Sequence, residues 1–446
     1  MRIKAILFLL IFSALSAWGQ NAAGMSVLDI DSAVKLALEN NLSLGRSEQE
    51  SAAARRRYEN SWNSFIPALS AGASMSRNTS LTHEVLPPLD SWTHALSLSA
   101  SLSINPASFA NINQTRREYE SGLLSLASAR HEMEFQVRLL YYQLLLLRAN
   151  ADLAMQNILS AQSRHEQTLT LLSVGQASNL DELSARLDLQ NQISNAQNAE
   201  GAYQNALDNF KYLLLLPMNE EIVLLGDLLS LRNLSSFSSL SSLSSPASRP
   251  QNGPSISSES MNISTLRQSI AVTEAQRSSI LLRTYSPTLS LSWNSAPRYN
   301  NVSDQWLDNG QFSIALSFRL DNYLPWSSAR EQVNTLNDSL ARQYSLLGEA
   351  LINHQNNVEK LLRDLSRSEE AINNLYLNLT LAEETLRMSE EAYARGTLDL
   401  QTLYSRRDNL AAVQNRIMTE QFNFLSTILE LERELNLPYT SIAWEE

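Results

Sequence analysis

Apolar positions along the chain follow two periods, and the longer one predicts most of the structure. From Leu123 to Val174 there is no Gly or Pro, and apolar residues recur at alternating spacings of four and three. This spacing is typical of a long helix with a coiled-coil seam. A helix of about 66 residues is about 100 Å long, which exceeds a compact single domain. The predicted helices cover 107–172, 180–216, 327–394 and 400–436, preceded by one over 26–64 that begins near Ala33 with Asp29 or Asp31 as cap.

The second period is strict alternation of apolar residues with serine. Leu96 and Leu98 alternate with Ser97 and Ser99, for example. A period of two is typical of a strand whose two faces meet different environments. The alternation predicts strands at about 66–76, 93–105, 287–296 and 311–320, and a short strand near 222–225 in a side domain.

The two halves of the chain resemble each other at an offset of about 220 residues. Pro67 aligns with Pro287, and Gly175 aligns with Gly396. We therefore expect an internal duplication, since helical spacing alone does not reproduce these landmarks. The expected domains are a first repeat over 20–216, a Ser/Pro-rich connection and equatorial region over 217–260, a second repeat over 261–437 and a tail over 438–446. The connection includes eight serines within 235–245, to which we assign no chemistry.

Composition supports a large, mostly helical protein and excludes several classes. Glycine and proline number only 12 each, and 43% of residues are hydrophobic against 18% charged, so wholesale disorder is not expected. A net charge of −12 repels nucleic-acid phosphates, so no nucleic acid partner is expected. The absence of cysteine excludes disulfides, thiol nucleophiles and a lipid-anchored cysteine.

The N-terminal residues 1–19 predict a cleaved signal peptide. Arg2 and Lys4 precede an apolar run over 5–15, and Ala17 and Gly19 form a small-x-small cleavage site. The apolar run is shorter than the ~20 residues that a transmembrane helix needs. We therefore expect an exported protein.

Four strands cannot cross a membrane alone, because every backbone polar group in hydrocarbon needs a partner and the sheet must close. Known barrels begin at about eight strands, whereas three copies of this chain supply twelve and leave an opening. The pattern therefore predicts a homotrimer with apolar residues toward outer membrane lipid and serines toward the lumen. A soluble sandwich, in which the alternation faces a protein core, is the alternative. Candidate membrane-interface aromatics are Trp62, Tyr323 and Trp326 at one end of the strands, and Trp92 and Trp306 at the other.

Three motifs resemble those of TolC-type outer membrane efflux proteins: LDIDSAVKLALENN at 28–41, LLSVGQASNLDEL at 171–183 and EEAYARGTLDLQTL at 390–403. The resemblance implies a mainly α fold with a membrane β-barrel, in which a trimeric 12-stranded barrel continues into a long α-helical periplasmic barrel. It places the protein in the outer membrane with a long periplasmic extension. The implied function is passive conduction of substrates, for efflux or type I secretion, from an inner-membrane transporter joined through a periplasmic adaptor (membrane fusion) protein.

The resemblance also implies where partners bind and where the channel closes. The helix hairpin tips at Val174, Gly175, Arg395 and Gly396 are candidate adaptor-docking residues, since glycine accepts the positive φ of a tight reversal. Candidate periplasmic gate residues are Tyr393, which matches the family's gate tyrosine, Asp399, and Gln401 and Tyr404, which occupy the family's aspartate positions. The family's linking arginine aligns on Leu398. Asp399 either supplies an acidic ring in part or caps the final helix.

Residue patterns for catalysis are missing from the sequence. The five histidines show no HExxH spacing, and there is no GxSxG or phosphate-binding glycine loop. We therefore expect no enzyme, no metal and no cofactor. Two alternative functions stay open: a non-conducting exported coiled-coil scaffold, and an exported hydrolase, which would need a nucleophile or metal constellation. The sequence does not identify a transported substrate.

Overall fold

The computed structural model describes residues 26–77, 92–226, 259–300 and 305–439. The predicted signal peptide and the serine-rich segment 235–245 lie outside these ranges. By its internal contacts the chain divides into two compact units. Of the described residues, the first comprises 26–42, 130–226 and 356–439, and the second comprises 43–77, 92–129, 259–300 and 305–355. Each unit is described by itself.

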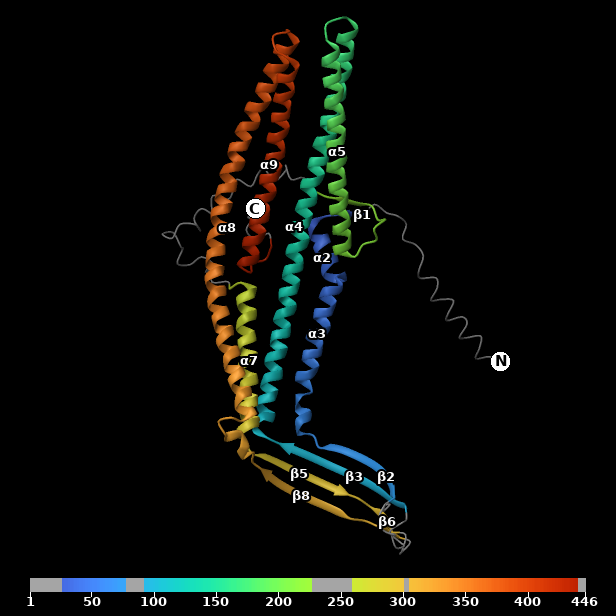
Figure 1. Ribbon diagram of the computed structural model, residues 1–446, viewed down its shortest axis with the longest axis vertical. Coiled ribbons are helices and arrows are strands. Elements are labelled where there is room, and N and C mark those ends of the chain that lie inside the picture. Colours follow the sequence, from blue (N-terminus) through green and yellow to red (C-terminus); the bar gives the residue numbers. More distant parts are fainter. Residues whose placement is uncertain (1–25, 78–91, 227–258, 301–304, 440–446) are drawn as a thin grey trace, which may run out of the picture. The chain divides into compact units, whose positions relative to one another are not determined.

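Four long helices form two helical hairpins (Figure 1). Helix α4 (Pro106–Ser173) and helix α5 (Asn179–Leu214) form the first hairpin. Helix α8 (Ser328–Ala394) and helix α9 (Leu400–Glu434) form the second. These bounds lie within two residues of the ranges expected from the apolar spacing. The long helices carry the functional ends of the molecule described below.

The segment before the first sheet strand differs from the single helix expected over 26–64. It consists of strand β1 (Ser26–Leu28), helices α2 (Ile30–Asn40) and α3 (Leu42–Glu59), and the 3-10 helix η1 (Ser61–Phe65). Helix α2 begins after Asp29, whose Oδ1 accepts a 2.8 Å hydrogen bond from the backbone N–H of Ser32. It ends because Asn41 adopts an extended ψ of 123°. Consecutive asparagines favour such a break, since their side chains compete for backbone hydrogen bonds.

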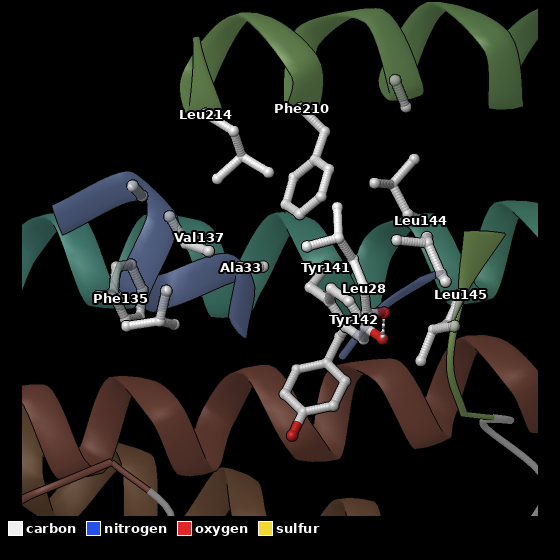
Figure 2. Packing of buried hydrophobic residues seen from close by; sticks show 14 of the residues in the cluster. Leu28, Ala33, Phe135, Val137, Tyr141, Tyr142, Leu144, Leu145, Phe210 and Leu214 are labelled. Atoms are coloured by element: carbon white, nitrogen blue, oxygen red, sulfur yellow. Dashed lines mark hydrogen bonds between the residues drawn. The ribbon is translucent and has the colours of Figure 1, made fainter. Parts of the chain in front are cut away.

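A short parallel sheet and an apolar core organise the first unit. Strand β1 pairs in parallel with β4 (Ile222–Leu224), and this pairing is why residues 26–28 are not helical. The Tyr141 hydroxyl lies 2.5 Å from the carbonyl oxygen of Leu225 and 3.1 Å from that of Leu28, so it ties the two strand ends together. Figure 2 shows the surrounding core of α2, α4 and α5, in which Val137, Leu144, Phe210 and Leu214 are fully buried.

The second unit contains one antiparallel sheet of long strands. The strands are β2 (Ala68–Arg77), β3 (Trp92–Ile104), β5 (Thr288–Ser295) and β8 (Gly310–Ser317), in the order β2-β3-β5-β8. Two three-residue strands that the sequence did not predict, β6 (Arg298–Asn300) and β7 (Gln305–Leu307), extend it near one end. Helix α7 (Met261–Tyr285) precedes β5, and the 3-10 helix η3 (Leu320–Tyr323) follows β8.

Strand register separates the sheet into two chemically different faces. Ser70 pairs with Ser99, Ser101 with Ser292, and Ser292 with Ser313. Two of these pairs, Ser70–Ser99 and Ser292–Ser313, have Oγ atoms 2.6 Å apart. The opposite face carries large apolar side chains that are exposed, such as Leu69 at 81% and Phe312 at 64%. An exposed apolar face of this extent indicates a contact surface outside the single chain.

No helix within the described ranges combines the length and apolar character needed to cross a membrane. The described part is mainly helical with one antiparallel sheet of four long strands.

Candidate functional site

The tip of the first hairpin is built around Gly175. Its backbone has φ +76°, its N–H donates to the carbonyl of Leu172 at 3.0 Å, and the N–H of Gln176 donates to the carbonyl of Leu171 at 2.8 Å. These two bonds form a Schellman motif, which closes a helix through one left-handed residue. Val174 beside it is 64% exposed, so the tip offers an apolar side chain to a partner.

The tip of the second hairpin repeats this geometry around Gly396. Its φ is +72°, its N–H donates to the carbonyl of Tyr393 at 2.8 Å, and the N–H of Thr397 donates to that of Ala392 at 3.0 Å. No neighbouring atom lies within 4 Å of a Cβ built on either glycine. Glycine is therefore required by backbone conformation and not by space. Arg395, with an exposed side chain, replaces the apolar residue of the first tip.

The helices that follow the two tips each begin with a capping pair, in which the N-cap residue bonds to the residue three positions later. Ser178 caps α5, accepting from the N–H of Asp181 at 3.1 Å, while its own N–H and hydroxyl donate to the Asp181 carboxylate at 2.8 and 2.7 Å. Asp399 caps α9, accepting from the N–H and the hydroxyl of Thr402, both at 2.8 Å. The backbone N–H and then the hydroxyl of Thr402 hold the pKa of Asp399 below its usual value. The candidate acidic-ring residue thus serves as a helix cap in the single chain.

A charged and aromatic cluster, which we call the intrachain link, joins the two hairpins. Arg164 of α4 donates to the carboxylate of Asp188 of α5 at 2.6 Å. The guanidinium carbon of Arg164 also lies 5.3 Å from the ring centroid of Tyr404 of α9, within cation–π range. Burial and the carboxylate of Asp188 raise the pKa of Asp408, one turn after Tyr404, while Arg164 opposes the shift. The intrachain link therefore comprises Arg164, Asp188, Tyr404 and Asp408.

A polar cavity of about 680 Å³ adjoins the intrachain link. It opens between the two hairpins within the first unit and contains both Arg164 and Asp408 in its wall. Arg407, also in the wall, donates to the carboxylate of Glu390 at 2.5 Å. The volume and polar lining leave room for water between the hairpins, so this interface is not a dry core.

The structure brings one of the four candidate gate residues, Tyr404, into the intrachain link. Tyr393 lies on the last turn of α8, where burial and then Asp181 raise the pKa of its hydroxyl. Gln401 is exposed in the first turn of α9. Sequence reasoning missed Arg164 and Asp188. The available signal was their similar distance from Gly175, because residues equally far from a hairpin turn lie side by side.

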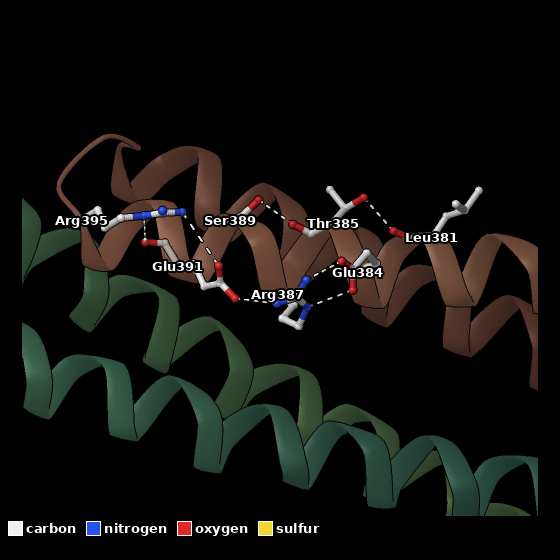
Figure 3. A network of polar contacts seen from close by, with 7 residues as sticks. All are labelled: Leu381, Glu384, Thr385, Arg387, Ser389, Glu391 and Arg395. Carbon is white, nitrogen blue, oxygen red and sulfur yellow. Dashed lines mark hydrogen bonds and ion pairs between the residues drawn. The ribbon is translucent and has the colours of Figure 1, made fainter.

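A second polar network lies on the exposed surface of α8 near the tip (Figure 3). Arg387 forms ion pairs with Glu384 and Glu391, each with a closest distance of 2.5 Å. Arg395 donates from Nε to the backbone carbonyl of Glu391 at 3.1 Å. Hydrogen bonding to Glu384 raises the pKa of Arg387, and the charges of both glutamates add to the effect. The outer surface of this tip is therefore ionic, and its charges are paired along the helix.

The five candidate interface aromatics lie at the strand ends. Trp62 of η1 precedes β2, while Tyr323 of η3 and the following Trp326 come after β8. Trp92 begins β3 opposite Arg77, and Trp306 of β7 pairs with Tyr299. Because neighbouring strands are antiparallel, the first three are at one end of the sheet and the last two are at the other. All five side chains are exposed.

Titratable side chains do not gather into a metal site in the part of the chain that the structure describes. No group of three or more His, Asp or Glu there is arranged to hold a metal ion. His165, which lies on the α4 seam, instead has its Nε2 3.3 Å from the carboxylate of Glu182 on α5.

Residues 33–214 match the family model described as outer membrane efflux protein. A search of curated protein sequences gives no match. The fold is similar to that of the Campylobacter jejuni CmeC outer membrane channel, with a TM-score of 0.75 and 15% identity over 91% of this chain and 85% of that one. It is also similar to VceC from Vibrio cholerae, with a TM-score of 0.74 and 13% identity over 92% and 96%. The open state of the Neisseria gonorrhoeae MtrE outer membrane channel gives a TM-score of 0.73 and 14% identity over 92% and 89%.

Proposed function

We propose that this chain, whose residues 33–214 match the outer membrane efflux protein family model, is the subunit of an outer membrane efflux channel. Three copies form the channel, which passively conducts substrates delivered by an inner-membrane transporter through a periplasmic adaptor. Similarity of fold to CmeC and MtrE, both described as outer membrane channels, supports this proposal. The likeness of motifs and element order in the two halves supports an internal duplication.

The two-faced sheet is the observation that carries the proposal. One face is lined by serine and the other carries exposed Leu, Ile, Phe and Trp. Strands β2 and β8 each pair on one side only among the described residues. Two open edges beside an apolar face are stable in lipid only if another sheet completes the hydrogen bonding. Edge-to-edge closure of β8 on β2 of the next copy gives twelve strands from three chains, with serine toward the lumen.

The helical hairpins are proposed to form the periplasmic tunnel, with their tips toward the adaptor. Val174 and Gly175 contribute an apolar tip, and Arg395 and Gly396 an ionic one. The exposed interface aromatics at both strand ends match the two levels at which a barrel meets lipid headgroups. This assignment puts the sheet in the outer membrane and the hairpins in the periplasm.

The intrachain link is proposed to hold the tunnel closed. Arg164 joins α4 to Asp188 on the same hairpin and to Tyr404 on the other. Because the Arg164 and Asp188 side chains are 12% and 19% exposed, their pairing is screened less than that of a surface pair. Opening requires the two hairpins to separate at this point. Asp399 contributes to closure through the start of α9, which it caps.

Expression in a Gram-negative host lacking its own efflux channel tests the function. We expect the protein in the outer membrane fraction, extracted only by detergent, and migrating as a trimer that heating converts to monomer. Reconstituted protein should produce discrete conductance steps in a planar bilayer. Arg164→Leu, which breaks the intrachain link, should raise the open fraction, and Thr385→Leu at the equivalent position of α8 should not. A detergent-free elongated monomer would identify a coiled-coil scaffold instead.

A further inference from the structure

Helix α5 carries a row of exposed leucines that the function proposed above does not use. Leu180, Leu183 and Leu187 are 71%, 59% and 61% exposed. Their spacings of three and four place them on one face of the helix. Within the described ranges no other segment covers this row, and burial of such a row against an apolar surface is favourable.

Helix α9 of the second hairpin has a face equivalent to the leucine row of α5, and the structure shows what that face contacts. At an offset of 221 residues, α4 and α8 end together, α5 and α9 begin together, and Gly175 matches Gly396. The same offset relates Leu183 to Tyr404 and Leu187 to Asp408. Tyr404 faces Arg164 of α4, and Asp408 lines the cavity beside it. The face of α9 that corresponds to the leucine row therefore packs toward α4.

The corresponding surface on α8 is apolar and exposed. The face of α4 that meets the second hairpin includes Gln156 and Ser160, which line the two cavities there. Their equivalents at an offset of 221 are Leu377 and Leu381, which are 62% and 58% exposed. Where α4 offers polar side chains to α9, α8 offers leucines. The match in chemistry between the exposed faces of α5 and α8 indicates that each is the other's partner.

We propose that Leu180, Leu183 and Leu187 of one copy pack against Leu377 and Leu381 of a second copy of this chain. The proposal rests on the trimeric channel proposed above. In Figure 1 α9 and α4 lie between α8 and α5 in the upper part of the two hairpins, so α5 and α8 are the outer helices. Successive copies in a ring therefore bring α5 of one beside α8 of the next, and a head-to-tail contact of this kind closes by rotation.

The tunnel then contains two kinds of seam in alternation. The seam within each chain is ionic and aromatic, through Arg164, Asp188 and Tyr404. The seam between copies is centred on leucines, and the Glu384–Arg387 ion pair of α8 lies beside it. Salt weakens the first kind of seam more than the second, because screening acts on the ion pair at the centre of the first and not on an apolar contact. Opening of the tip by salt therefore occurs within each chain while the copies stay joined.

Cysteine crosslinking in this naturally cysteine-free chain tests the seam. Thr385 is the offset equivalent of Arg164, so Leu183→Cys combined with Thr385→Cys places one thiol on each side of the proposed seam. Mild oxidation of outer membranes should give covalent dimers and trimers on gels without reductant. Arg164→Cys combined with Tyr404→Cys should crosslink within one chain and leave only monomers. Each single-cysteine variant should give no ladder of dimers and trimers.

Crosslinking results separate failure of the seam from failure of the channel. Heat-modifiable trimers without the covalent ladder would overturn the leucine seam and leave the proposed function standing. Absence of any trimer before oxidation would overturn both. As a second measurement, Leu183→Asp combined with Leu187→Asp should reduce the trimer fraction at least tenfold, since both side chains are exposed in the single chain and the monomer still folds. Leu183→Met is the matched control that keeps the trimer, and unchanged trimer in the aspartate variant would also overturn the seam.

Discussion

The two hairpins share one backbone design and differ in the chemistry of their faces. Both reverse through a left-handed glycine, and both restart with a cap three residues later. The cap pair is serine with aspartate in the first hairpin and aspartate with threonine in the second. Arg164 and Asp188 of the first correspond to Thr385 and Asn409 of the second. Backbone geometry therefore constrains only a few positions, which leaves the helix faces free to contact different partners.

The largest expected difference between the hairpins follows from the Arg164–Asp188 pair. Arg164→Leu leaves the mostly buried Asp188 carboxylate without its ionic partner. We expect a local loss of about 2 kcal/mol, which corresponds to roughly thirtyfold faster amide hydrogen exchange. The effect should appear in α4 and α5 on both sides of the pair, measured by hydrogen exchange with mass spectrometry.

Thr385→Leu is the matched change in the second hairpin. The Thr385 hydroxyl donates to the carbonyl of Leu381 in its own helix at 2.7 Å, so its loss should alter stability by less than about 0.5 kcal/mol. Equal effects of the two substitutions would show that the Arg164–Asp188 pair does not distinguish the hairpins.

The glycine turns should respond alike, which tests the shared part of the design. Gly175→Ala and Gly396→Ala each force a side chain into positive φ, at a cost of about 1 kcal/mol. Gly201→Ala, inside α5 with open space around its Cβ, should instead stabilise by about 0.5 kcal/mol or more. Hydrogen exchange at the tips and thermal unfolding measure these effects. A stabilised tip variant would contradict the glycine argument.

Removal of the Ser178 cap should destabilise the protein as much as the glycine substitutions or less, and only at the start of α5. Ser178→Ala loses the bond from the N–H of Asp181 and should destabilise the first turn of α5 by about 1 kcal/mol. Ser178→Asn retains an acceptor and serves as the control. Exchange of the first-turn amides of α5 should increase only in the alanine variant, and an equal increase in both would mean that the cap bond contributes nothing.

Periodicity was sufficient to predict the mainly helical fold with its four long strands, because each long element contains many repeats of its period. The segment near Ser26 was predicted wrongly as helix for the opposite reason. A three-residue strand has no measurable period, and its pairing with Ile222 depends on distant parts of the chain. The break at Asn41 likewise depends on one residue's ψ. Short elements therefore need tertiary information.

Within the candidate site, the turn glycines were predictable because backbone conformation dictates the residue. Gly175 and Gly396 were found because a tight helix reversal needs positive φ. The intrachain link was not found, because the contact of Arg164 with Tyr404 depends on how two hairpins pack. For Asp399 the sequence left two roles open, as part of an acidic ring or as the cap of the final helix. In the single chain it is a cap, and an acidic ring stays a prediction.

The smallest expected effect concerns Asp399 and Asp408, whose contributions to folding stability should depend on pH with opposite signs. Hydrogen bonds lower the pKa of Asp399 in the folded state. The stability that Asp399 contributes is therefore present above its pKa in the unfolded chain, about 3.9. It is lost as pH falls through the pKa of the folded state. Asp399→Ser keeps an uncharged cap and should flatten the loss of stability in acid.

Burial raises the pKa of Asp408, so its contribution has the opposite sign. Stability is greatest below the unfolded value, where the carboxyl is neutral in both states, and decreases as pH rises through the folded pKa. Asp408→Asn should be more stable than the parent at pH 7, by less than about 0.5 kcal/mol because the group is partly solvated, and equal to it near pH 3. Thermal unfolding between pH 3 and pH 7 measures both variants. If Asp408→Asn instead lost stability at pH 7, the carboxylate would be a favourable partner of Arg164, and the intrachain link would hold the hairpins through two carboxylates.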